Sequence, residues 1–168
     1  KYLENKSIKK ILLIADTFFP EKNSAALMLQ TLAKYIHNNE VELIVVTPHD
    51  NPKKKINILT DVSDISTILE KFGMVISADG LTKYELAVSG IPSIFYSIDS
   101  EHFEANKEFL KLGFGIHLGL HSLIDQRNLR EAIIEAKSPK FIGKARQIKA
   151  NYFLEFGLER LWRQLCQI

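Results

Sequence analysis

A turn with free backbone donors is predicted near the middle of the chain. Asp79 and Gly80 follow the short apolar run Met74–Ser77, and Thr82 begins a predicted helix that ends at Gly90. Such an apolar run is typical of a strand buried in a parallel sheet, and Asp-Gly favours a turn. The first N–H groups of the helix then point out of the carboxyl edge of the sheet, where they attract anions, phosphate above all.

The same residues could also serve local structure alone. Thr82 and Glu85 have the spacing of a capping box, in which Glu85 reaches back to the backbone N–H of Thr82. From the residues alone, this interpretation is at least as strong as ligand binding.

The stretch resembles the nucleotide-binding half of the GT-B glycosyltransferases. That family has a strand, a Gly-rich turn, Thr, Tyr-Glu-Leu-Ala, a small residue, Gly, a branched residue and Pro. The matching positions here are Gly80, Thr82, Tyr84–Ala87, Gly90 and Ile91-Pro92. Within the superfamily, the chain is similar to the UDP-sugar hydrolase of pseudaminic acid synthesis and to the spore-coat polysaccharide biosynthesis proteins. The resemblance continues through 101–113 and extends more weakly over 10–136.

The resemblance implies a set of residues that bind a UDP-sugar. Glu85 matches the residue that holds the ribose hydroxyls in the family. Where relatives have paired glycines after the first strand, this chain has Asp16, which would repel a diphosphate. Where relatives carry Gln near the start of a later helix, it has His102. The implied ligand-binding residues are Gly80, Leu81, Thr82, Glu85, Asp16, Thr17, Glu101, His102 and Asn106.

Other chemistry has weaker support. Glu101 and His102 could form an acid/base pair, although a helix-start role for Glu101 and a solvated His102 are the simpler interpretation. His117 and His121 flank a glycine loop, where a surface position is expected. The histidines lack metal-ligand spacing, and a single cysteine excludes a Cys-based zinc site. No Gly-x-Ser-x-Gly or Walker motif is present, so we expect no metal and no cofactor.

The composition indicates one globular domain over residues 1–168. The net charge of +2 is too small to favour nucleic acid. No apolar run has the length of a membrane span, and no signal peptide is evident, so a cytoplasmic location is expected. The chain starts at Lys1 without Met, and we expect a fragment of a longer protein with a missing N-terminal domain.

Alternating apolar strands and amphipathic helices predict an α/β fold with a doubly wound parallel sheet of about six strands, Rossmann-like, equivalent to a single GT-B half-domain. The expected strands are 10–15, 41–46, 56–59, 74–77, 93–96 and 115–118. The expected helices are 25–38, 61 or 63 to about 72, 82–89, 102–112, 122 or 125 to about 137, and 139 to the end.

Three functions compete. The first is the UDP-sugar-binding half of a GT-B glycosyltransferase or UDP-sugar hydrolase in bacterial surface-glycan or nonulosonic-acid synthesis. Because the resemblance places the catalytic histidine in the other half, this chain alone is not expected to be catalytic. The second is a degenerate interaction module attached to a sugar-activating enzyme such as a CMP-sialic acid synthetase-like cytidylyltransferase. The third is a response-regulator receiver, suggested by Asp16 and Asp79 but lacking the acidic pair and a lysine after the last strand.

Overall fold

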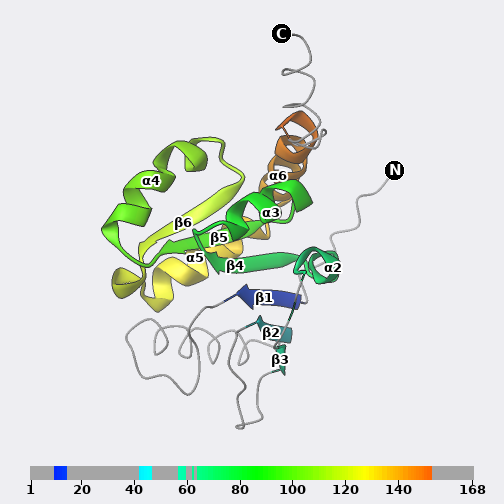
Figure 1. Ribbon diagram of the computed structural model, residues 1–168, viewed down its shortest axis with the longest axis horizontal. Helices are drawn as coiled ribbons and strands as arrows, with labels where there is room; N and C mark the ends of the chain where they lie inside the picture. Colours follow the sequence, from blue (N-terminus) through cyan, green and yellow to red (C-terminus); the bar gives the residue numbers. More distant parts are fainter. Residues whose placement is uncertain (1–9, 15–41, 47–56, 60–61, 63, 153–168) are drawn as a thin grey trace.

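The computed structural model describes residues 10–14, 42–46, 57–59, 62 and 64–152. In this part of the chain, six strands form one sheet in the order β3-β2-β1-β4-β5-β6, and every neighbouring pair is parallel. The predicted doubly wound parallel fold is therefore confirmed (Figure 1). The strands are β1 Lys10–Ile14, β2 Glu42–Val46, β3 Asn57–Leu59, β4 Met74–Ala78, β5 Ser93–Ser97 and β6 Gly115–Leu120.

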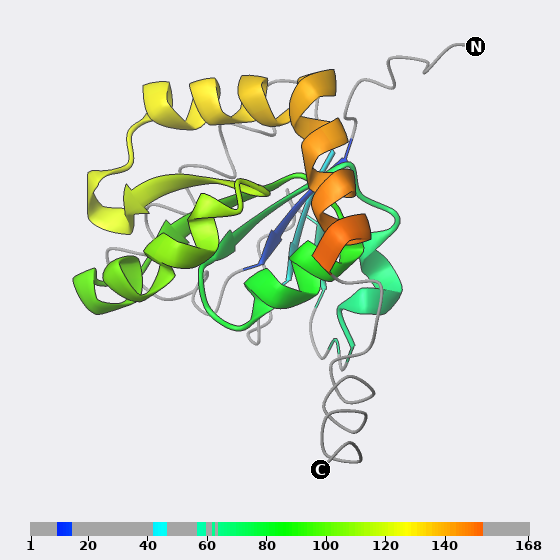
Figure 2. The same ribbon diagram turned by 90° about the horizontal axis from the view of Figure 1, so that it is seen from above.

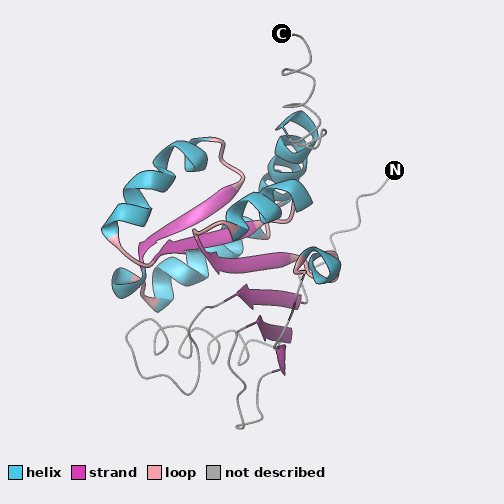
Figure 3. Ribbon diagram, in the orientation of Figure 1, coloured by secondary structure: helices cyan, strands magenta, loops and turns pink. Residues whose placement is uncertain are grey.

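Helices cover both faces of the sheet (Figures 2 and 3). On one face α5 and the start of α6 pack against the sheet through Leu129, Ala132 and Phe141. On the other face α2 and α3 contribute Leu69 and Leu86, and α6 reaches that cluster with Ile148. The described helices are α2 Ser66–Leu69, α3 Thr82–Ser89, α4 Ser100–Lys111, the 3-10 turn η1 His121–Leu123, α5 Gln126–Ala136 and α6 Pro139–Tyr152.

The apolar strands supply both cores because successive side chains of a strand point to opposite faces. In β1, Ile11 and Leu13 join the cluster under α5, whereas Leu12 joins the cluster under α3. All three are at most 1% exposed. A parallel sheet buried on both faces needs such continuous apolar strands, which is why they were visible in the sequence.

Several helix ends follow the predicted chemistry. Gly90 ends α3 with φ of 69°, and Gly113 follows α4 with φ of 73°; both conformations favour glycine. Asp125 opens α5 in a capping box with Asn128. Pro139 is the first residue of α6, where its missing N–H is not needed.

Other boundaries differ from the prediction. The helix expected from residue 61 or 63 is only the four residues of α2, with Asp64 accepting from the backbone N–H of Ser66 at 2.8 Å. Strand β6 runs two residues further than expected, to Leu120. The predicted helix 25–38, the caps at Asp61 and Ser63, and the chain beyond 152 lie outside the described residues.

The strand order also separates the competing folds. A receiver domain has the order 2-1-3-4-5, whereas this sheet has 3-2-1-4-5-6. The receiver interpretation is therefore excluded.

Among the described residues, no helix is long and apolar enough to cross a bilayer.

Candidate ligand site at the carboxyl edge of the sheet

The Gly80 turn joins the carboxyl end of β4 to α3. Gly80 is exposed, and a Cβ built on it would meet no atom within 4 Å. It is also not among the glycines with positive φ. Neither the backbone conformation nor internal packing therefore requires glycine here. The open space above the turn allows another molecule to approach the backbone closely.

The predicted capping box at this turn is wrong. Leu81 occupies the N-cap position with helical angles, φ −63° and ψ −30°, and no side chain caps the helix. The backbone N–H of Tyr84 instead bonds to the carbonyl of Leu81 at 3.0 Å. Because the chain enters the helix one residue early, Thr82 already lies inside it, and a cap requires a non-helical residue. Glu85 is exposed on α3.

A buried polar cluster lies beneath the turn and joins three strands. Asp79 follows β4, Ser97 ends β5 and His117 belongs to β6. The Ser97 hydroxyl contacts Asp79 Oδ2, and His117 Nε2 lies 3.0 Å from the same oxygen and 3.1 Å from Ser97 Oγ. The side chain of His117 is only 8% exposed, so the surface position expected for it is wrong.

One backbone group fixes the tautomer of His117. The N–H of Gly119 donates to His117 Nδ1 at 2.9 Å, so Nδ1 is an acceptor and the ring proton resides on Nε2. Nε2 then donates to Asp79, and the Ser97 hydroxyl donates to the same carboxylate. A nucleophilic serine needs a histidine nitrogen free to take its proton. His117 offers none, so this cluster is not a hydrolase triad.

Asp79 is an ionised carboxylate in this setting. Burial raises its pKa, but hydrogen bonds from His117 and Ser97 outweigh burial, and the net pKa is lowered. The residue is 2% exposed. Its second oxygen, Oδ1, is buried and has no hydrogen-bond partner among the described residues.

Lys83 and Asn106 connect the turn to α4. The Lys83 ammonium donates to the carbonyl of Asp79 at 3.2 Å and to Oδ1 of Asn106. The amide of Asn106 donates to the carbonyl of His102 at 2.7 Å, and Asn106 is 2% exposed. Lys83 makes no ion pair with a carboxylate among the described residues. The positive charge of Lys83 therefore lies beside the Gly80 turn and contacts only uncharged hydrogen-bond acceptors among these residues.

The acid/base partner of His102 is Asp99, not Glu101. His102 Nδ1 lies 2.8 and 2.9 Å from the two oxygens of Asp99, and Asp99 also caps α4 by accepting from the backbone N–H of His102. The hydrogen bond that His102 donates to Asp99 raises the pKa of His102, and the bonds from the backbone and side chain of His102 lower the pKa of Asp99. Glu101 lies in the first turn of α4, as predicted.

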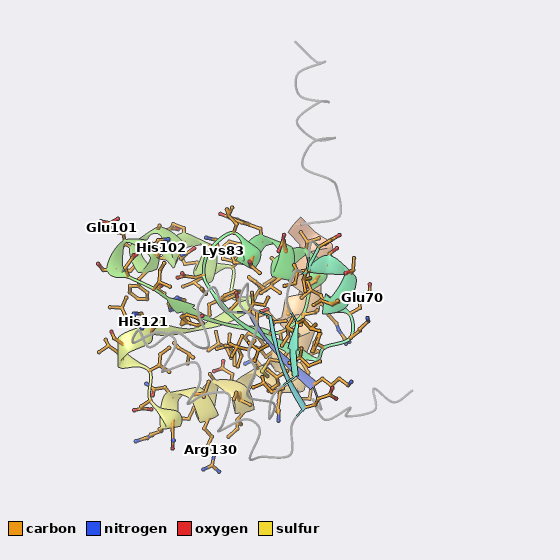
Figure 4. The ribbon with its side chains drawn as sticks, turned by 60° about the horizontal axis from the view of Figure 1, so that its bottom comes forward. Glu70, Lys83, Glu101, His102, His121 and Arg130 are labelled. Atoms are coloured by element: carbon orange, nitrogen blue, oxygen red, sulfur yellow. The ribbon has the colours of Figure 1, made fainter. Side chains whose placement is uncertain are left out.

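The structure brings together part of the predicted site. Lys83, His102 and Glu101 lie along one side of the molecule in Figure 4. Leu81 is 83% exposed beside Gly80. Glu85 instead borders a groove of about 1120 Å³ whose other lining residues include Lys10, Gly73 and Pro92. The last three residues lie at the amino ends of β1, β4 and β5. Asp16 and Thr17 lie outside the described residues.

Sequence reasoning did not identify five of the residues at this edge as site residues: Asp79, Lys83, Ser97, Asp99 and His117. One signal was available for three of them, because Asp79, Ser97 and Asp99 all lie where apolar strands end. The described residues contain no group of three or more His, Cys, Asp or Glu side chains that could hold a metal ion.

The fold is shared with known sugar-transferring enzymes. The glycosyltransferase SsfS6 from Streptomyces sp. SF2575, complexed with thymidine diphosphate, superposes with a TM-score of 0.63 at 18% identity over 88% of this chain and 38% of its own. The spinosyn rhamnosyltransferase SpnG, also with thymidine diphosphate, gives 0.66 at 18% identity, over 86% and 41%. This chain has the fold of one half of a GT-B glycosyltransferase.

One curated protein is similar to part of the chain in sequence. The chain is 32% identical over 107 residues to the "Pseudaminic acid cytidylyltransferase and UDP-2,4-diacetamido-2,4,6-trideoxy-beta-L-altropyranose hydrolase" of Helicobacter pylori. The match covers 61% of this chain and 21% of that protein. This GT-B half-domain thus spans about a fifth of the curated relative and about two fifths of the solved structures. No protein-family model matches it.

Proposed function

We propose that the chain is the UDP-sugar-binding half of a GT-B-type enzyme, either a glycosyltransferase or a UDP-sugar hydrolase, in bacterial surface-glycan or nonulosonic-acid biosynthesis. The similarity to a protein named as a hydrolase of a UDP-linked diacetamido sugar supports the sugar nucleotide and the setting. The thymidine diphosphate complexes of two structural neighbours support a pyrimidine nucleoside diphosphate.

One observation carries this proposal: the open Gly80 turn at the start of α3, next to the point where the strand order reverses. In doubly wound sheets, ligands bind at the carboxyl ends of the strands beside that reversal, here between β1 and β4. The first N–H groups of a helix lack partners within the helix. At α3 the N–H groups of Lys83 and Tyr84 already bond to the carbonyls of Gly80 and Leu81. The N–H groups of Leu81 and Thr82 are therefore the ones that would meet the diphosphate, together with the ammonium of Lys83.

The remaining predicted residues have assigned roles in this proposal. Thr82, free of a capping role, offers its hydroxyl to the phosphates. Glu85, one helical turn further along α3 and on the border of the groove at the amino ends of the strands, accepts from the ribose hydroxyls if the ribose extends along α3 away from the carboxyl edge. His102 lies in the first turn of α4 and Asn106 one turn further along it, on the side where the sugar would lie. A second domain would close the cleft and supply the catalytic base.

Titration calorimetry on the folded chain tests the proposal. We expect UDP and UDP-N-acetylglucosamine to bind weakly, with dissociation constants near millimolar, because one wall of the cleft is absent. CMP should bind more weakly still, since it lacks the second phosphate. No heat with any nucleotide at millimolar concentration, from a chain shown to be folded by circular dichroism, would overturn the proposal.

A second candidate is an interaction module without a ligand, attached to a cytidylyltransferase. It is favoured by the name of the curated relative, which joins a cytidylyltransferase and a hydrolase in one protein. The two candidates differ in one measurement. A module of this kind would bind no UDP, yet its deletion from the full-length protein would reduce cytidylyltransferase activity.

A further inference from the structure

Asp79 has a feature that the proposed function leaves unexplained. Its carboxylate is 2% exposed and ionised, and one of its oxygens has two partners while the other has none among the described residues. A buried acceptor without a donor destabilises the folded protein by the desolvation of that group. Such an atom is retained where something else in the working molecule supplies the donor.

The missing donor belongs on the side of the carboxylate opposite Ser97 and His117. These two residues, from β5 and β6, hold Oδ2. The two oxygens of a carboxylate project to opposite sides of its axis. Oδ1 therefore lies on the side away from these two donors, and Asp79 itself ends β4 next to the reversal of strand order between β4 and β1.

Open space begins at the next residue. Gly80 is exposed and has no atom within 4 Å of a Cβ position, and consecutive Cα atoms are about 3.8 Å apart. A ligand lying on the Gly80 turn would therefore rest next to Asp79 in the chain, with the Lys83 ammonium also beside the turn. The negative charge of Asp79 also contributes to the raised pKa of His102, which places the two groups within electrostatic range.

The chemistry of Asp79 selects the part of the ligand that it can contact. An ionised carboxylate only accepts hydrogen bonds, and it repels phosphate oxygens. A neutral hydroxyl is the donor that a sugar nucleotide offers in several copies. We propose that Asp79 is a specificity residue whose Oδ1 accepts a hydrogen bond from a sugar hydroxyl of the nucleotide sugar, with Ser97 and His117 holding the carboxylate in position. This inference rests on the proposed function of the Gly80 turn.

The geometry of the cluster supports this division of roles. With its proton on Nε2, His117 can donate to Asp79 but cannot accept from a ligand through that atom. The Ser97 hydroxyl also donates its hydrogen bond to this carboxylate. Both residues therefore act as positioning residues, and Oδ1 is the atom of the cluster left for recognition.

The decisive variant is Asp79→Asn. Its amide can keep the bonds to Ser97 and His117 through its oxygen and then presents an NH₂ group where Oδ1 stood. Because charge-assisted hydrogen bonds are about twice as strong as neutral ones, we expect the affinity for UDP-N-acetylglucosamine to fall about tenfold. Titration of UDP alone separates the two sources of the hydroxyl. A tenfold loss for both ligands assigns a ribose hydroxyl, and a loss for the UDP-sugar alone assigns a hexose hydroxyl.

Ser97→Ala extends the test if Asp79→Asn does not fold, with Ser93→Ala as its matched control. Both serines are buried on β5, but Ser93 Oγ donates to the carbonyl of Ile91, outside the cluster. Ser97→Ala should weaken the same ligand about threefold, and Ser93→Ala should leave its affinity unchanged.

Two outcomes would overturn the inference. Wild-type affinity for both ligands in folded Asp79→Asn would assign Oδ1 to a partner within the protein, while leaving the proposed function intact. Absence of binding by the wild-type chain would remove both together. The two failures are therefore distinguishable.

Discussion

At the scale of single residues, the hydrogen bonds of His117 predict which ring nitrogen holds its proton. Its Nδ1 accepts from the N–H of Gly119, so the neutral ring should be the Nε2–H tautomer. Nitrogen-15 NMR of the neutral ring should show a protonated Nε2 and a bare Nδ1. The Ser97→Ala variant should keep that tautomer, because Gly119 rather than Ser97 sets it. A protonated Nδ1 in the wild type would contradict the hydrogen-bond assignment.

His102 offers a prediction about pH. Its pKa is raised from 6.5 by the hydrogen bond and charge of Asp99. Stabilisation by this pair should be complete below pH 6.5 and lost as the pH rises through the raised pKa of His102. On the acid side it should be lost as the pH falls through the lowered pKa of Asp99. The NMR titration midpoint of His102 should therefore lie above 6.5 and fall toward it in Asp99→Asn.

Asp99→Asn is a clean variant for this purpose. Asn caps helices about as well as Asp, so α4 should keep its start while the ion pair disappears. The thermal midpoint at a pH above the raised pKa of His102, where the imidazole is neutral, should then change little. An unchanged His102 midpoint in the variant would show that Asp99 does not hold the imidazole in solution.

Gly80 separates folding from binding. Because an added Cβ meets nothing within 4 Å and φ is not positive, Gly80→Ala should leave the free energy of unfolding within about 0.5 kcal/mol. The methyl group would nevertheless occupy the space above the turn, and UDP affinity should fall about tenfold. Gly143→Ala on α6, also with open space around it, is the matched control and should leave UDP affinity unchanged. Equal UDP affinity of Gly80→Ala and the wild type would show that the diphosphate does not lie on this turn.

At the scale of elements, the packing of β6 against β5 depends on a glycine of β6 that faces an aromatic ring of β5. A Cβ on Gly115 would stand 2.3 Å from the ring of Phe95, which is fully buried and packs edge-on against Phe114. The ring cannot move without disturbing the core, so Gly115→Ala should destabilise the protein by about 1–3 kcal/mol. Urea denaturation would measure this. A loss no larger than that of Gly143→Ala would contradict it, since a methyl group on Gly143 would meet no atom within 4 Å.

Features held by residues close together in the sequence could be predicted, whereas those that join distant residues could not. Strand β4 and the stop at Gly90 follow from neighbouring residues, so local patterns predicted them. The cap at Thr82 was wrong because the turn placed Leu81 in a helical conformation, which the pattern of residue types does not determine. The cluster of Asp79, Ser97 and His117 was not predicted, because its members are 18 to 38 residues apart and meet only through the strand order.

At the scale of the whole molecule, the proposed ligand site has one wall in this half-domain. The structural neighbours are more than twice as long as the part that this chain matches, with 38% and 41% of their chains covered. Asp79, Lys83 and His102 all lie at the carboxyl edge, so a second domain seated over that edge would cover them. In this arrangement, this chain can bind the nucleotide sugar by itself, whereas catalysis requires the second domain as well.

If a second half-domain completes the cleft, the full-length protein should bind UDP-N-acetylglucosamine at least tenfold more tightly than residues 1–168, since closing a site over a ligand adds contacts and excludes water. Release of the sugar should occur only in the full-length protein, because the described residues hold no activated nucleophile. Gly80→Ala and Asp79→Asn should weaken binding by the same factors in both forms, since both residues contact the ligand from this wall. Release of sugar by the isolated chain at the full-length rate would place the catalytic group within residues 1–168 and would contradict the division of roles proposed for the two halves.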